Sequence, residues 1–133
     1  MIRRIIFICK HNVFRSRIAE TLFNRLNKNL QFKAKSAGII IGQHPDKNQA
    51  DVIKKRGIEI KGNPAGLSIK LLDQQDIVIL VANDVPPSIF PKKYTKKLIV
   101  WKIPDVTNGD KREIDRVIRL IEKGVKDLIK NLK

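Results

Sequence analysis

Apolar and polar positions alternate along the chain in blocks that predict strands and helices in turn. Continuous apolar runs at 5–8, 77–81 and 98–101 are typical of strands buried on both faces. A weaker run at 32–37, which stops at Gly38, predicts a further strand. A segment at 67–72 fits either a short helix or a turn.

Helical spacing appears between these runs. An apolar stripe follows the first run, and a longer one fills the last 20 or so residues. Asp46 is a good N-cap for a helix that reaches Arg56 and ends at Gly57, and Asp110 with Glu113 resembles a capping box for the final helix. The stripes consist of Ile18, Ala19, Leu22, Phe23 and Leu26, and of Ile114, Val117, Ile118, Ile121, Val125, Leu128 and Ile129.

This alternation predicts an α/β fold: a doubly wound sheet of about four parallel strands with helices on both faces. We find no internal repeat or linker, so we expect residues 1–133 to form a single domain. Ligands of such sheets bind beyond the carboxyl ends of the strands. Chemistry is therefore expected in the residues that follow each strand.

Composition narrows the function classes. A lone cysteine in 133 residues excludes an internal disulfide and any cluster of cysteine ligands. The net charge of +15 favours nucleic acid, an acidic surface or a small anionic substrate as partner. We see no apolar run long enough for a membrane helix and no signal peptide, so we expect a cytoplasmic protein without membrane association.

The segment after the first strand carries the strongest chemical signal. Cys9 ends the apolar run, and Arg15 and Ser16 open the next helix. A turn from strand to helix directs backbone N–H groups into one concavity that favours an anion, and Arg15 can bind two oxygens of that anion. The same donors would stabilise a Cys9 thiolate, to which Ser16 can donate a hydrogen bond. The segment, which we call the cradle loop, comprises Lys10, His11, Asn12, Val13, Phe14 and Arg15.

Taken together, these residues resemble the low-molecular-weight protein tyrosine phosphatases and their thioredoxin-coupled arsenate reductase relatives. The resemblance spans nearly the whole chain. Its motifs are the run from Ile5 to Cys9, Arg15-Ser16, Ile18-Ala19-Glu20, Ser36-Ala37-Gly38, Arg56-Gly57-Ile58, Asp76-Ile77-Val78-Ile79 and Trp101-Lys102-Ile103-Pro104-Asp105.

The resemblance implies a phosphate-monoester hydrolase that is a protein tyrosine phosphatase. Cys9 would be the nucleophile, Arg15 the phosphate ligand, and Asp105 the general acid and then base. Asp105 is preferred to Asp84 because it fits the family's Trp-x-Ile-x-Asp pattern and follows a strand at the same sheet edge. No metal or cofactor is expected, and a contact between His11 and substrate is left open.

Three departures from the family stand out. Phe14 replaces a second cysteine, Arg17 replaces a proline, and residues 106–109 replace a segment with proline and tyrosines. The lone cysteine excludes the disulfide relay of the thioredoxin-coupled reductases.

Two alternatives stay open. One is arsenate reduction with an external small thiol on the same site. The other is a basic binding protein on a phosphatase fold without activity, because lysines are dense at 92–97 and in the final helix. As partners we expect a phosphorylated protein or a small phosphate monoester, at most weak binding to nucleic acid or acidic surfaces, and a monomeric protein.

Overall fold

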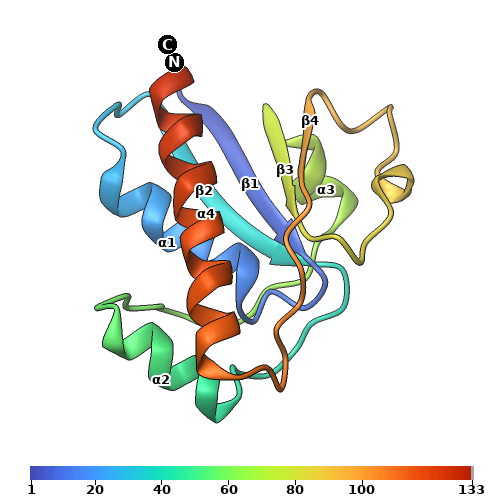
Figure 1. Cartoon of the computed structure of the whole chain (residues 1–133). Helices are drawn as coiled ribbons and strands as arrows, with labels where there is room; N and C mark the ends of the chain where they lie inside the picture. Colours follow the sequence, from blue (N-terminus) through green and yellow to red (C-terminus); the bar gives the residue numbers. More distant parts are fainter. Residues whose placement is uncertain (133) are drawn as a thin grey trace.

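Four parallel strands form the central sheet of the protein, seen here in a computed structural model that describes residues 1–132. Their order is β2-β1-β3-β4 (Figure 1). The strands are β1 (Arg3–Cys9), β2 (Phe32–Gly38), β3 (Ile77–Val81) and β4 (Leu98–Trp101). The predicted parallel sheet is confirmed, and β1 is longer at both ends than its apolar run.

Three helices cover one face of the sheet, and Figure 1 shows two of them, α1 and α4, side by side. They are α1 (Arg15–Leu26), α2 (Lys47–Lys55) and α4 (Lys111–Asn131). The opposite face is covered by the short helix α3 (Ile69–Asp73) and by the segment containing the 3-10 turn η1 (Pro87–Ile89). Within residues 1–132, no helix is both long and apolar enough to cross a membrane.

The continuous apolar run of β1 is explained by this two-sided cover. Alternate side chains of a strand point to opposite faces. Ile5 and Phe7 therefore enter the core shared with α1 and α4, while Ile6 and Ile8 enter the core beneath α3. All four are fully buried, because each has apolar neighbours on its own side of the sheet.

Local signals in the sequence set most helix ends. The Asp46 side chain accepts a hydrogen bond from the Gln49 N–H, and the Gln49 side chain returns one to the Asp46 N–H, which makes a complete capping box. Asp110 caps α4 through the Glu113 N–H at 2.8 Å. The complete box thus lies at α2 rather than at α4, where the sequence suggested it. Gly57, with φ +68°, follows α2 as predicted.

The sheet order places the carboxyl end of β1 at the point where the winding reverses. From β1 the chain passes through α1 to β2 on one side, whereas β3 pairs with β1 on the other side. Crevices at such switch points are the usual ligand sites of open α/β sheets. Cys9 ends β1 opposite Gly38 of β2, so it lies in this crevice.

Candidate active site

The cradle loop leaves β1 directly after Cys9 and enters α1 at Arg15. Asn12 adopts a left-handed backbone with φ 55°, a conformation that asparagine tolerates better than most residues. This single left-handed residue lets the chain turn sharply enough to bring the start of α1 back over the end of β1.

The carbonyl groups of the loop point away from its hollow side. The N–H groups of Ile39, Ile40 and Gly42 donate to the carbonyls of Cys9, Lys10 and His11 at 3.2, 2.9 and 3.0 Å. In a trans peptide the C=O and the following N–H point in opposite directions. The amides of residues 10–12 therefore face the other side of the loop, as an anion cradle requires.

Asn12 is the side chain that braces the loop. Its Nδ2 donates to the hydroxyls of Ser16 and Ser36 at 2.8 and 2.9 Å, and its Oδ1 accepts from the Ala65 N–H at 2.8 Å. These bonds join the loop to α1, to β2 and to the segment before α3. Each is buried or partly buried, so the loop is rigid before any ligand arrives.

Gly38 provides the space for this close packing. A Cβ at that position would lie 2.7 Å from both the Asn12 nitrogen and the His11 carbonyl carbon. No side chain fits there without displacing the loop backbone. The Ser-Ala-Gly at the end of β2 is thus explained by the approach of the loop.

The thiol of Cys9 is buried beneath the loop and lies 3.0 Å from the Ser16 hydroxyl. Because Ser16 also accepts a hydrogen bond from Asn12, its own proton is free to point at the sulfur. A hydroxyl donor at this distance stabilises a negative charge on Sγ.

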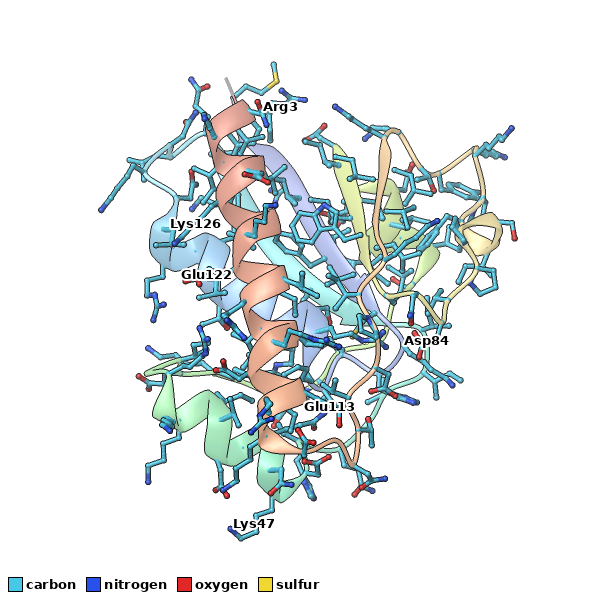
Figure 2. The ribbon with its side chains drawn as sticks, viewed as in Figure 1. Arg3, Lys47, Asp84, Glu113, Glu122 and Lys126 are labelled. Atoms are coloured by element: carbon cyan, nitrogen blue, oxygen red, sulfur yellow. The ribbon has the colours of Figure 1, made fainter. Side chains whose placement is uncertain are left out.

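The guanidinium of Arg15 joins the cradle loop to two other loops. It is 5% exposed, and its Nη1 donates to the Ile103 carbonyl while its Nη2 donates to Asp84, both at 2.9 Å. These two bonds use only part of its donor set, so further N–H groups remain for an anion. Asp84 follows β3 at the carboxyl edge of the sheet (Figure 2).

A cavity of about 360 Å³ opens above the loop. Of the predicted residues, Cys9, His11, Val13, Phe14, Arg15 and Asp105 line it. Lys10, Asn12 and Ser16 lie outside the lining and contribute backbone or support. Sequence reasoning missed the rest of the wall, which consists of Ile41, Gly42, His44, Asp46, Gln49 and Thr107.

Most of the missed residues come from one segment between β2 and the start of α2. Among these residues only Asp46 carries a signal in the sequence, as a helix cap. Nothing in their spacing predicts a site, because only the fold brings this segment against the cradle loop.

Asp105 lies on the segment that follows β4, which we call the acid loop (residues 102–110). Its Oδ1 accepts hydrogen bonds from the Thr107 N–H and hydroxyl at 2.9 and 2.7 Å. Burial raises the pKa of Asp105, but these bonds and the positive charges of Arg15 and His11 outweigh it and hold the pKa below its usual value.

The two candidate acids occupy different positions. Asp105 lines the cavity beside Cys9, whereas Asp84 lies outside the lining and is paired with Arg15. Asp84 is therefore placed to orient the arginine, and Asp105 is placed to reach a bound molecule. His11 also lines the cavity, and its Nδ1 lies 2.9 Å from the Ile40 carbonyl.

The residues that depart from the resemblance have clear structural places. Phe14 is buried and forms an apolar wall of the cavity. The Nη2 of Arg17 donates to the carbonyls of Lys61 and Gly62 at 2.5 and 3.0 Å, which fastens the loop after α2 to α1. Among residues 1–132, no group of three or more His, Cys, Asp or Glu side chains is placed to hold a metal ion.

A buried cysteine and arginine at the two ends of an anion cradle, after the first strand of this fold, define a cysteine-dependent phosphatase. The chain belongs to the low molecular weight phosphotyrosine protein phosphatase family, whose model matches residues 4–133.

Solved structures agree with this assignment. The chain is 29% identical to an arsenate reductase from Archaeoglobus fulgidus, with 96% of this chain and 99% of that chain covered and a TM-score of 0.79. It is 25% identical to a low molecular weight protein tyrosine phosphatase from T. tengcongensis, with 98% and 99% covered and a TM-score of 0.82. It is also 25% identical to the tyrosine phosphatase Wzb from Escherichia coli K30 in complex with sulphate, with both chains fully covered and a TM-score of 0.81.

Proposed function

We propose that this protein hydrolyses phosphate monoesters, phosphotyrosyl residues of proteins above all, with residues 1–133 acting as one catalytic domain. The observation that carries the proposal is that Cys9 and Arg15, at the two ends of the cradle loop, line one cavity together with Asp105 from the acid loop. A nucleophile, an anion ligand and a proton donor at one site are the groups that this reaction needs.

In the proposed complex the phosphoryl group rests on the cradle loop. The amides of the loop and the remaining N–H groups of Arg15 would bind the three non-bridging oxygens. Val13 and Phe14 would contact the ester group, because their side chains form the apolar part of the cavity. His11, which lines the same cavity, would lie beside the bound phosphate.

The reaction proceeds in two displacements. The Cys9 thiolate attacks phosphorus, so that the S–P bond forms while the P–O ester bond breaks and Asp105 gives its proton to the leaving oxygen. Water then attacks the phospho-cysteine and passes a proton to the Asp105 carboxylate. The S–P bond breaks, which restores the thiolate and releases phosphate.

Hydrolysis of a series of aryl phosphates tests the roles directly. We expect Cys9→Ser to lower kcat by about 10³-fold or more, because the serine hydroxyl is a far weaker nucleophile. Asp105→Asn should lower kcat most for substrates with basic leaving groups, which depend on the acid. Asp84→Asn should weaken phosphate binding about equally for all leaving groups, because it disturbs only Arg15.

Asp127→Asn, on α4, is a matched control that should leave turnover unchanged. Activity that survives Cys9→Ser would contradict the mechanism. A leaving-group effect in Asp84→Asn rather than in Asp105→Asn would assign the role of general acid to Asp84 instead of Asp105. A wild-type protein without turnover would favour a basic binding protein on this fold.

Arsenate reduction is a second candidate, favoured by the likeness to the Archaeoglobus fulgidus reductase structure. Arsenate has the shape and charge of phosphate, so the same cradle would accept it. The lone cysteine requires two equivalents of an external thiol, which would be oxidised to a disulfide as arsenate is reduced to arsenite. Arsenite formation with a small thiol, without aryl phosphate turnover, would support this candidate.

A further inference from the structure

A strip of exposed isoleucines runs along the edge of the catalytic cavity. Ile39, Ile40 and Ile41 are 37%, 59% and 60% exposed. Their backbone is nevertheless fixed, because the N–H groups of Ile39 and Ile40 donate to carbonyls at the start of the cradle loop. Three consecutive large apolar side chains held rigidly in water are a feature of binding surfaces rather than of folding.

The strip connects the catalytic cavity to a second hollow. Ile41 lines the catalytic cavity, and Ile39 lines a hollow of about 220 Å³. Two residues of extended chain span at most about 7 Å, so the two openings are close neighbours. The hollow is lined by Ile39, Leu67, Ser68, Ile69, Leu72, Ile89, Phe90 and Pro91.

This hollow is built to receive an apolar side chain. Leu72 and Phe90 are buried and form its floor, while Ile69 and Ile89 are 50% and 42% exposed and form its rim. Its volume is below the roughly 300–1,000 Å³ of sites for whole small molecules. A single side chain of a longer molecule fits that size better than a separate ligand.

Lysines outnumber acidic residues beside the residues that line the hollow, where Asp73, after Leu72, is the one carboxylate. Lys70 follows the rim residue Ile69, and Lys92 and Lys93 follow Pro91; all three lysines are exposed. The ion pairs formed within residues 1–132 do not include them. An occupant with acidic residues beside its apolar side chain would complement this rim.

We propose that the hollow is a docking subsite for a protein substrate. It would hold an apolar residue about two to four positions from the phosphorylated residue, within an acidic stretch. This inference rests on the proposed phosphatase function. The occupant is a polypeptide because a chain whose phosphorylated residue enters the catalytic cavity can continue past Ile39–Ile41, and the strip is continuous with both openings.

Phosphotyrosyl peptides with leucine or serine at each position up to four residues from the phosphotyrosine, in an acidic background, test the proposal. For wild type we expect leucine at one of these positions to raise kcat/KM by about fivefold or more over serine. Ile69→Ser and Ile89→Ser should each remove most of that preference. Both variants should hydrolyse p-nitrophenyl phosphate normally, because that substrate does not reach the hollow.

Leu30→Ser is the matched control, since Leu30 is 84% exposed and lies just before β2, at the opposite end of the sheet. This variant should keep both the leucine preference with peptides and the normal hydrolysis of p-nitrophenyl phosphate. A wild type that hydrolyses p-nitrophenyl phosphate but shows no leucine preference would overturn the docking subsite and leave the proposed function standing. Loss of p-nitrophenyl phosphate turnover in wild type would overturn both.

A membrane is the competing occupant, because apolar side chains among lysines also bind anionic lipid. Flotation with vesicles of phosphatidylserine and phosphatidylcholine separates the two. We expect wild type and Ile89→Ser to float with these vesicles to the same extent. Vesicle binding lost in Ile89→Ser, together with no leucine preference, would assign the hollow to a lipid surface and overturn the proposal.

Discussion

Thr107 controls the charge of the proposed acid. Its hydroxyl and backbone N–H both donate to the same oxygen of Asp105. These bonds favour the carboxylate, and with Arg15 and His11 they hold the Asp105 pKa below its usual value despite the opposing effect of burial. The free enzyme therefore keeps Asp105 ionised over most of the pH range and presents the acid form at low pH.

Thr107→Val should move the pH dependence of turnover to higher pH. The variant loses the side-chain hydrogen bond, so the Asp105 pKa rises and the protonated form persists further up the pH scale. In profiles of kcat/KM for an aryl phosphate, the descending limb that reports Asp105 should shift upward. The control is Thr95→Val, because the Thr95 hydroxyl donates to the Pro91 carbonyl in the loop between η1 and β4. It should leave the descending limb of the pH profile in place. A downward shift would contradict the argument.

Single residues differ in how well the sequence predicts them. Cys9 and Arg15 flank a strand-to-helix turn, so their spacing alone indicates an anion site with a nucleophile. Ile41 and His44 show no such spacing. They line the cavity because the chain between β2 and α2 crosses the cradle loop, and that crossing depends on the whole fold.

At the scale of elements, the start of α2 supports the acid loop. Asp46 caps α2 with one carboxylate oxygen and accepts the Asn108 N–H at 2.9 Å with the other. Asn48 adds a hydrogen bond from its side chain to the Gly109 carbonyl. Helix α2 thus fixes the far end of the loop that carries Asp105, while Arg15 fixes its near end through Ile103.

Asp46→Ala should therefore lower both stability and turnover. Loss of the cap should cost about 1–2 kcal/mol in the free energy of unfolding. Loss of the Asn108 contact should lower kcat more than it raises KM, because it loosens Asp105 rather than the cradle loop. Urea unfolding and steady-state kinetics measure the two effects.

Asp110→Ala is the matched control, because Asp110 caps α4 through the Glu113 N–H but, within residues 1–132, donates or accepts no hydrogen bond with residues 105–109. It should show a similar loss of stability with a smaller loss of kcat. Equal kinetic losses in the two variants would mean that capping alone, and not the bond to Asn108, supports the loop.

Elements with strong local signals were predictable. The apolar runs of β1 and β3 and the stripe of α4 are long enough to identify by period alone. The local pattern at 67–72 fits a helix or a turn equally well, and in the structure helix α3 begins within it, at Ile69.

For the molecule as a whole, the net charge of +15 is far more than the proposed reaction requires, since that reaction would use only Arg15 and backbone amides. On α4, Arg119 pairs with Asp115, one turn apart. Lys126 pairs in the same way with Glu122 (Figure 2). The remaining positive charge would attract acidic substrates over distances of about a Debye length.

Added salt should lower kcat/KM for acidic substrates more than for neutral ones. Between about 20 and 300 mM NaCl, we expect kcat/KM for a phosphopeptide of net charge near −5 to fall about tenfold through screening of the attraction. A neutral phosphopeptide of equal length serves as the control and should change about twofold or less. Equal salt dependence of the two peptides would show that the charge does not steer substrates.

The sequence by itself determined the α/β class, the strand-loop-helix cradle with its cysteine and arginine, and the exclusion of any internal disulfide relay. These features are local: they depend on residue spacing within a few turns of chain and on a count of cysteines. Tertiary structure decided which aspartate faces the cavity, because Asp84 and Asp105 follow neighbouring parallel strands and differ only in where their loops lead. It also decided the cavity wall and its isoleucine strip, since segments far apart in sequence meet only where the sheet order brings their ends together.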